Sequence, residues 1–286
     1  MQSNNPVFRN AEGFNRQNAY GNATYAGNGA AYPGYGQQGY DDPSTWGVGT
    51  PGAPTQAPTQ RMTVDSVVQK TGISLGVVIV TAALTWWFTG DITDEGIPAA
   101  LLGAMTIGSL GAFALSMVNS FKRVVSPALV IAFCALEGVA LGALSKYFDA
   151  YFGGGIVTQA VLGTFAAFAG TLAAYKVLDI KVGAKFLTFV IAAMFGMVAL
   201  SLLEMGLGLF GNELGLFGFG GLGLVFAVVG LVLGVFMLIL DFDFVEQGVA
   251  AGIEERESWR AAFAMTVSLV WIYTNLLRIL AILQQD

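Results

Sequence analysis

Long hydrophobic segments separated by short polar connections dominate the chain from Thr71 onward. Each segment approaches or exceeds the roughly 20 residues that a helix needs to cross a bilayer. Gly, Pro, Asn and charged residues fill the connections, as expected between helices. The pattern predicts seven spans, with six and a re-entrant last segment as the alternative: Ile73–Phe88, Ile97–Val118, Pro127–Tyr147, Ile156–Val177, Lys185–Leu207, Leu216–Leu240 and Ala261–Leu283.

The limits of the membrane domain follow from its first span and its connections. The first span is short, but it can be extended backwards through Val67 and Val68. The most polar connection, Glu246 to Arg260, lies between spans six and seven. The membrane domain therefore covers residues 61–286.

Residues 1–60 have a different composition, rich in Gly, Asn, Gln, Tyr, Pro and Ala. Such a segment buries too little apolar surface to offset its ordering entropy, so we expect a disordered tail. No apolar region follows its first basic residues, so it lacks the pattern of a cleavable signal. We interpret it as a cytoplasmic tail, in which contacts with protein partners stay open.

Composition supports a bilayer as the surrounding medium. Hydrophobic residues make up 55% of the 286 residues and charged residues 11%, whereas a soluble domain carries about a quarter charged residues. The mean hydropathy is +0.66. The 38 glycines suit close approach of helices in lipid. No basic cluster indicates a nucleic-acid partner.

The absence of histidine and the single cysteine, Cys134, narrow the chemistry. They exclude Ser-His and Cys-His catalysis, His-ligated zinc and an intrachain disulfide. We therefore expect no enzymatic activity and no cofactor.

Basic residues predict the orientation of the spans, because cytoplasmic connections are enriched in Lys and Arg. With the N-terminus inside, the only outside basic residue is Lys146, and the C-terminus lies outside. The inside segments then hold eleven basic residues: Arg9, Arg16, Arg61, Lys70, Lys122, Arg123, Lys176, Lys181, Lys185, Arg256 and Arg260.

Glu137 lies at the centre of the third span, ten residues from either end. A charge at the bilayer centre costs at least about 2.5–3.5 kcal/mol, so its presence needs a reason. Gly138 and Gly142 form a small-xxx-small pair, which predicts close helix packing and places Glu137 in the bundle interior. It either joins helices through a hydrogen bond or lines a polar path, and we favour the path.

Asp241 and Asp243 end the sixth predicted span. Side chains two positions apart on a helix point in different directions, so the two aspartates need not be a pair. Acids are unfavourable at a helix C-terminus. Besides a solvated terminus, the pattern indicates a latch of ion pairs with Arg256 and Arg260 or a cation site.

The seventh span carries several polar residues, among them Tyr273, Asn275 and Arg278. A polar helix flanked by six apolar helices is expected at the centre of the bundle. Arg278 lies near the end of its span and can snorkel to the outer interface. Glu204, near the outer end of the fifth span, is its candidate partner.

The carboxylates of the spans favour one kind of bound ion. Oxygen ligands suit hard cations such as Ca²⁺ better than transition metals. Two carboxylates that approach across a bundle also titrate as a coupled pair. The residues therefore indicate a proton-sensitive cation path, for which Ca²⁺ is a candidate permeant ion.

Several short motifs, in this order on seven spans, resemble the Bax inhibitor-1/YccA-like (transmembrane Bax inhibitor motif) family, in its bacterial branch with a glycine-rich tail. The resemblance covers residues 62–286 and the opening Asn5-Pro6-Val7-Phe8. It is carried by the segments Ala135–Gly142, Thr158–Thr164, Leu240–Phe244, Leu269–Tyr273 and Leu277-Arg278.

The resemblance implies an all-α protein of the bacterial plasma membrane, with seven helices, a central last helix and, for some members, a pH-sensitive Ca²⁺ leak. In those members, an aspartate ending span six pairs with another in span seven and gates the pore. The first position falls at Asp241 or Asp243, with Asp241 favoured. The second falls at Asn275, and span seven contains no Asp or Glu. An Asp–Asn pair cannot share a proton as two carboxylates do, so Glu137 or the loop arginines would sense pH.

Three other functions are alternatives to the leak. A regulatory or scaffold protein that conducts nothing would explain the long tail and the incomplete acidic pair. An intramembrane aspartyl protease needs two aspartates at membrane depth, and the run Gly221–Leu224 contains none. A secondary transporter would show two matched hydrophobic halves, and an odd number of spans disfavours this. The oligomeric state stays open.

Overall fold

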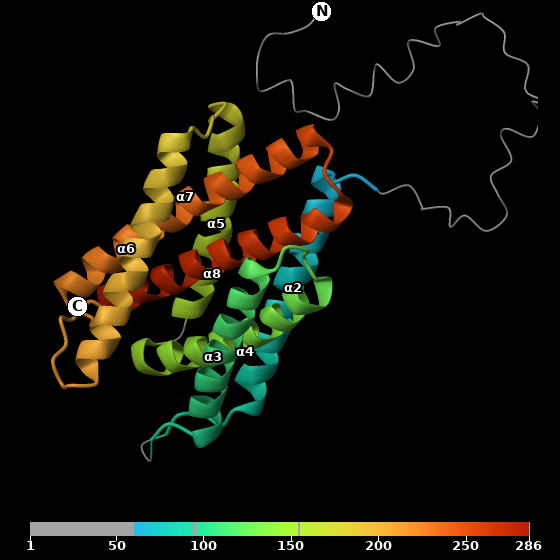
Figure 1. Cartoon of the computed structure of the whole chain (residues 1–286). Helices are drawn as coiled ribbons and strands as arrows, with labels where there is room; N and C mark the ends of the chain where they lie inside the picture. The colour runs from blue at the N-terminus through green and yellow to red at the C-terminus, as the bar shows by residue number, and fades with distance from the viewer. Residues whose placement is uncertain (1–59, 94–95, 154, 286) are drawn as a thin grey trace, which may run out of the picture. The chain divides into compact units, whose positions relative to one another are not determined.

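The computed structural model describes residues 60–93, 96–153 and 155–285. In these ranges it has seven helices long and apolar enough to cross a membrane, which confirms the predicted number. Figure 1 shows them as α2 (Val64–Phe88), α3 (Ala99–Phe121), α4 (Pro127–Phe152), α5 (Ile156–Val177), α6 (Ala184–Gly208), α7 (Gly221–Ala251) and α8 (Ser258–Leu283). The predicted disordered tail lies outside the described residues, except for Gln60.

α8 is the central helix, as predicted. It contacts α2, α4, α5 and α7, whereas α3 packs on α4 and α6 packs on α7. Figure 1 shows α8 running between α7 and the group formed by α2, α3 and α4. Its buried residues include Thr266, Ser268 and Asn275, so polar side chains lie inside the bundle.

α7 differs most from the predicted span. It begins at Gly221 and continues to Ala251, eleven residues beyond the predicted end at Leu240. The apolar residues Phe242 and Val245 keep a buried face on this extension. The helix ends at Gly252, whose φ of +64° is a left-handed conformation that glycine adopts without strain. The predicted polar connection is therefore reduced to a few residues and one 3-10 turn, η3 (Glu255–Glu257).

α4 and α2 pack closely at two glycines. A Cβ on Gly142 would lie 2.8 Å from the Cα of Ala82, and one on Gly138 would lie 3.0 Å from the carbonyl carbon of Val78. The predicted small-xxx-small contact is confirmed, and it brings the backbone of α2 against that of α4.

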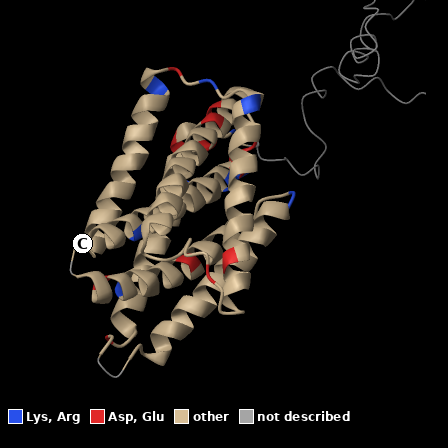
Figure 2. Ribbon diagram, turned by 90° about the vertical axis from the view of Figure 1, so that its left-hand side faces the viewer, with Lys and Arg blue, Asp and Glu red and all other residues tan. Residues whose placement is uncertain are grey.

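Charged residues lie mainly near the ends of the helices, and Figure 2 shows long helical stretches without them. Many large hydrophobic side chains are exposed on the outside of the bundle, such as Ile107 (69%) and Phe195 (73%). In water this surface would be unfavourable, but a lipid bilayer solvates it.

Candidate functional site

The contact between α7 and α8 holds a polar pair at membrane depth. The hydroxyl of Ser268 on α8 donates a hydrogen bond to the Asp241 carboxylate on α7, with 2.6 Å between the oxygens. Ser268 is fully buried. Asp241 lies ten residues before the end of α7, so it is an intrahelical residue and not the helix terminus that the sequence predicted.

Two glycines allow α7 and α8 to approach each other. A Cβ on Gly234 would lie 2.6 Å from Cγ1 of Ile272, and one on Gly230 would lie 2.8 Å from Cγ of Asn275. The indole N–H of Trp271 donates to the carbonyl of Gly230 at 2.8 Å. Aromatic and polar residues of α8 therefore rest directly on the backbone of α7.

Asn275 is buried, and its amide donates to the carbonyl of Trp271 at 2.8 Å. It packs against Gly230, whereas Asp241 contacts Ser268. Ser268 and Asn275 are seven residues apart, about 10 Å along the helix. The Asp–Asn pair that the resemblance implied is therefore not formed, because Ser268 occupies the position beside Asp241.

Asp243 points to a different partner. Its carboxylate accepts a hydrogen bond from the side chain of Gln247, one turn further along α7, at 2.7 Å. One residue before Gln247, Glu246 accepts the Tyr175 hydroxyl at 2.7 Å and ties α7 to the end of α5. As expected from their spacing, Asp241 and Asp243 do not form a pair.

Glu137 lies on the face of α4 that meets α8. One turn before it, Phe133 packs edge-on against Phe263 of α8, with ring centroids 5.0 Å apart. Further along, the hydroxyls of Ser145 and Tyr273 are 2.6 Å apart. These two contacts show that α4 and α8 run in the same direction side by side, with Phe133 level with Phe263 and Ser145 level with Tyr273. By interpolation, Glu137 lies about level with Val267, the neighbour of Ser268. Its partly buried carboxylate makes no ion pair with any residue that the structure describes.

α8 therefore has an intramembrane carboxylate on each of two sides at one level. Asp241 approaches it from α7 and Glu137 from α4. Sequence reasoning found both acids but missed Ser268, the hydrogen-bond partner of Asp241 on the adjoining surface of α8. A signal was present for Ser268, because it precedes Asn275 by two helical turns and so shares a face with it.

Arg278 and Glu204 do not bind each other, in contrast to the predicted ion pair. Both hold the segment before α7. The buried Glu204 carboxylate accepts backbone N–H groups from Leu214, Gly215 and Leu216 at 2.8–3.0 Å. Arg278 donates to the carbonyl of Leu216 at 2.7 Å. The backbone satisfies each charge, so the two side chains need not meet.

Arg256 and Arg260 likewise do not form the predicted latch with Asp241 and Asp243. Arg256 donates to the carbonyl of Val125 at 2.8 Å. Arg260 pairs with Glu257 and donates to the carbonyl of Arg123 at 2.9 Å. The extension of α7 explains the difference, because it separates both aspartates from the basic connection. The arginines instead join the start of α8 to the α3–α4 connection.

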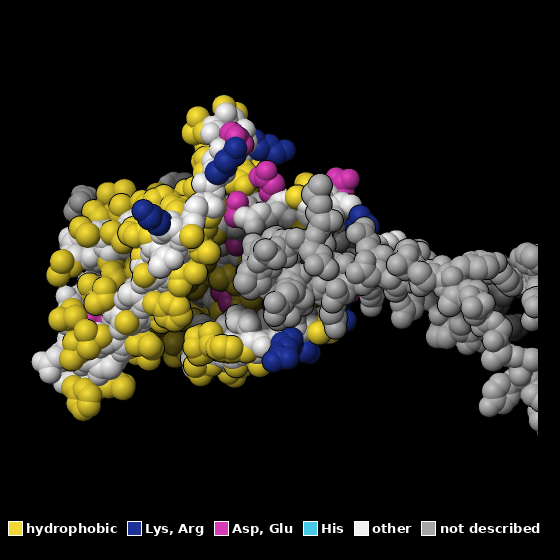
Figure 3. Space-filling model, turned by 45° about the horizontal axis from the view of Figure 1, so that its top comes forward, with side chains coloured by type: hydrophobic (Ala, Val, Ile, Leu, Met, Phe, Trp, Pro, Cys, Tyr) yellow, Lys and Arg dark blue, Asp and Glu magenta, His cyan; other side chains and the backbone are white. Residues whose placement is uncertain are grey.

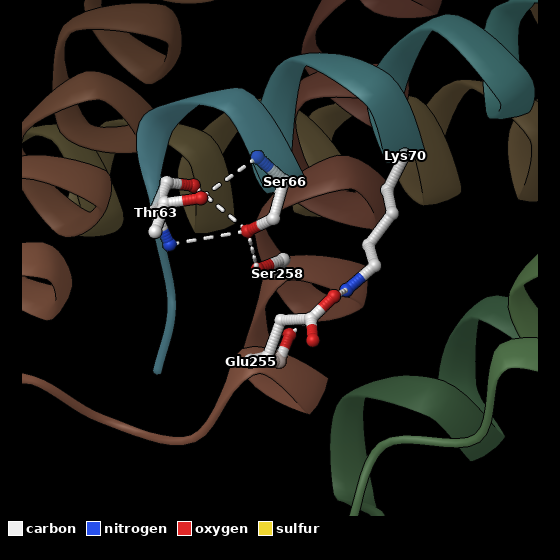
Figure 4. A network of polar contacts seen from close by, with 5 residues as sticks. All are labelled: Thr63, Ser66, Lys70, Glu255 and Ser258. Carbon is white, nitrogen blue, oxygen red and sulfur yellow. Dashed lines mark hydrogen bonds and ion pairs between the residues drawn. The ribbon is translucent and has the colours of Figure 1, made fainter. Parts of the chain in front are cut away.

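The connection between α7 and α8 is fastened to the start of α2 by a set of contacts that we call the clasp. Figure 4 shows its core, in which Lys70 pairs with Glu255 at 2.8 Å and the hydroxyls of Ser66 and Ser258 meet at 2.7 Å. Ser66 also completes a capping box with Thr63 at the start of α2. Two backbone bonds complete the clasp, from Met62 to Ile253 and from Glu255 to Gln60.

The clasp lies at the end of the bundle where α2 and α8 begin, which is the predicted inner end. Figure 3 shows acidic and basic side chains gathered at one end of a largely hydrophobic surface. Glu246 and Asp243, on the last turns of α7, belong to this end because Glu246 contacts the end of α5.

Comparison with known proteins identifies the family to which this arrangement belongs. A family model described as Bax inhibitor 1 like matches residues 5–285, which is nearly the whole chain. No curated protein matches the chain. The match covers all seven helices as well as most of the N-terminal tail. The chain belongs to the Bax inhibitor 1 like family.

Proposed function

We propose that this membrane protein lets cations, Ca²⁺ among them, leak across the bilayer along α8 in a pH-dependent manner. The observation that supports the proposal most directly is the placement of Asp241 and Glu137 on two sides of α8 at one level. An intramembrane carboxylate is costly unless it is protonated or paired. A passing cation would offset that cost at a site with two such groups.

Polar groups continue along α8 on both sides of this level. Towards the predicted outer end come the Ser145–Tyr273 hydroxyl pair and then Asn275. Selective paths in membrane proteins are built from such hydroxyls, amides and carboxylates, which replace part of the hydration shell of an ion. The proposed path therefore follows α8 from the carboxylates of the predicted inner end to the level of Asn275.

Proton sensing in this proposal differs from the two-aspartate gate. The amide of Asn275 does not titrate, and Ser268 occupies the place beside Asp241. The second acid is Glu137, which reaches α8 from another helix. Protonation of either carboxylate would remove a negative charge from the path, so flux is expected to depend on both residues.

The membrane and the orientation that we propose for the protein come from the sequence. The family resemblance implies the bacterial plasma membrane. We place the N-terminus inside, because eleven of the thirteen basic residues then lie on the cytoplasmic side. We assign it no enzymatic reaction. The tail is its candidate contact with protein partners.

The test is Ca²⁺ flux into dye-loaded proteoliposomes at pH 6 and pH 8, with protein-free vesicles alongside. We expect protein-dependent flux that differs between the two pH values. Glu137→Gln and Asp241→Asn should each reduce flux at least several-fold or remove its pH dependence. Glu213→Gln is the matched control, because this exposed carboxylate lies in the connection between α6 and α7, outside the proposed path, and should leave flux unchanged.

The alternative is a regulatory or scaffold protein that conducts nothing. The clasp favours this alternative, because it couples the segment that follows the tail to the connection before α8. No flux at either pH from folded protein would support this alternative and reject the leak. Flux that both Glu137→Gln and Asp241→Asn leave unchanged would reject the path along α8.

A further inference from the structure

An apolar groove lies between α2 and α5. Its volume is about 500 Å³, within the range of about 300–1,000 Å³ typical of small-molecule sites. α2 forms one wall with Ile79, Ala83 and Trp86, and α5 forms the other with Val161 and Phe165. Ile79 is 55% exposed and Phe165 is 45% exposed, so the groove opens on the outside of the bundle, where lipid lies.

The floor of the groove belongs to α4 and α8. Leu141 and Leu269 form part of it and are only 8% and 4% exposed. Ser145 and Tyr273 also line it, but their hydroxyls bond to each other. The hydroxyl of Thr164 bonds to a carbonyl within α5. The hydroxyls of the lining are thus already engaged within the protein, and none of its residues is charged.

The groove has the length of one leaflet. It extends from Leu75 to Trp87 on α2, twelve residues or about 18 Å. That is close to half of the roughly 30 Å hydrocarbon core of a bilayer. Trp86 and Trp87 stand at one end, where α2 ends, and tryptophans favour the membrane–water interface. The other end of the groove therefore falls near the middle of the bilayer.

We propose that this groove binds one acyl chain of a bilayer phospholipid. An uncharged hydrocarbon chain suits this lining, because the hydroxyl groups of the lining are already hydrogen-bonded within the protein. An extended peptide segment does not, because its backbone N–H and C=O groups would be left unpaired in the groove. The bound chain lies against Leu269 and Tyr273, so a membrane lipid becomes part of the packing of α8. This site does not depend on ion conduction.

Photolabelling in the bilayer tests the site on the full chain. The protein is reconstituted with a phosphatidylcholine that carries a diazirine on one acyl chain, irradiated and mapped by mass spectrometry. We expect adducts at Leu141 and Leu269, which lipid around the bundle cannot reach. Adducts at Ile107 on α3, an exposed residue outside the groove, provide the reference.

A filling substitution gives the second arm. Val161→Phe adds bulk to the wall and should lower floor adducts at least fivefold relative to Ile107. Val198→Phe, at an α6 residue of similar exposure (43% against 37%), should leave them unchanged. Ala83→Leu narrows the opposite wall and repeats the test if Val161→Phe does not fold.

Three results would overturn the proposal. The first is labelling of Ile107 without labelling of the floor. The second is floor labelling that neither filling variant lowers. The third is floor labelling by a diazirine fatty acid but not by the phospholipid probe, because the occupant would then be a free acid.

Discussion

Gly142 of α4 offers a sharp test of how the helices pack. A Cβ at this position would lie 2.8 Å from the Cα of Ala82 and 2.9 Å from its carbonyl carbon. Cβ atoms in proteins essentially never come closer than 3.0 Å to another heavy atom. Both obstacles are backbone atoms, which cannot rotate away as a side chain would. Gly142→Ala therefore forces α2 and α4 apart.

The expected cost follows from two opposing contributions. Overpacking of a close contact costs about 1–3 kcal/mol, and the upper part of that range applies because backbone meets backbone. Alanine is a better helix former than glycine by about 1 kcal/mol. The net loss of stability is thus about 1–2 kcal/mol. Gly76→Ala on α2 is the matched control, because nothing lies within 4 Å of its added methyl group, and it should be neutral or stabilising.

Thermal unfolding in detergent, followed by tryptophan fluorescence, measures both variants. For a chain of this size, 1 kcal/mol corresponds to a shift of about 2–4 °C. Gly142→Ala should lower Tm by about 2–8 °C, and Gly76→Ala should leave it unchanged or raise it. Equal Tm values for the two variants would show that α2 and α4 do not meet at Gly142.

Three further substitutions test contacts at other places in the bundle. The carboxylate of Glu204 accepts three backbone N–H groups, so Glu204→Gln should lower the free energy of unfolding by about 1–3 kcal/mol. The control Glu213→Gln, at an exposed residue, should change it by less than about 0.5 kcal/mol. Lys70→Met should cost at most about 1 kcal/mol, and less as salt is raised, so a loss independent of salt would contradict the ion pair with Glu255. Trp271→Phe removes the donor to a carbonyl of α7 and should cost about 1 kcal/mol in the same unfolding assay; no change would mean that water replaces the donor.

The number of helices and the central place of α8 were predictable from the sequence. Hydrophobic length sets the spans, because each must cross the same hydrocarbon thickness. The polarity of the last span indicated its central position, since a bilayer tolerates polar side chains only inside a bundle. Close approach of another helix at Gly138 and Gly142 was also predictable, because small residues at helical spacing mark such contacts, but the sequence did not indicate that this helix is α2.

The end of α7 was not predictable from hydrophobic length alone. Hydropathy falls at Asp241, so the predicted span stopped there. The helix continues because Phe242 and Val245 maintain a buried face while polar residues fill the other side. This amphipathic extension changed the position of both aspartates along the helix, and with it their expected pairing with Arg256 and Arg260.

The partners of the polar residues depend on the register between helices, which no single span reveals. Asp241 meets Ser268 only because α7 and α8 pack at one particular offset. Glu204 and Arg278 were placed at the same end correctly, but each binds backbone of the 214–216 segment. Local sequence gives the depth of a side chain, whereas the packing of whole helices decides its partner.

The glycines of α7 allow the close packing on which the polar contacts between α7 and α8 depend. With a side chain at Gly230 or Gly234, α7 would collide with Asn275 or Ile272 and would have to move away from α8. The hydrogen bond between Asp241 and Ser268 depends on the same close approach, since it spans only 2.6 Å. The distance between α7 and α8 therefore sets whether this carboxylate is paired with Ser268, and in the proposed leak an unpaired Asp241 would attract a cation. Any event that separates the two helices would break the bond between Asp241 and Ser268. The small residues of α7 and the polar residues of α8 are therefore both needed for this interface.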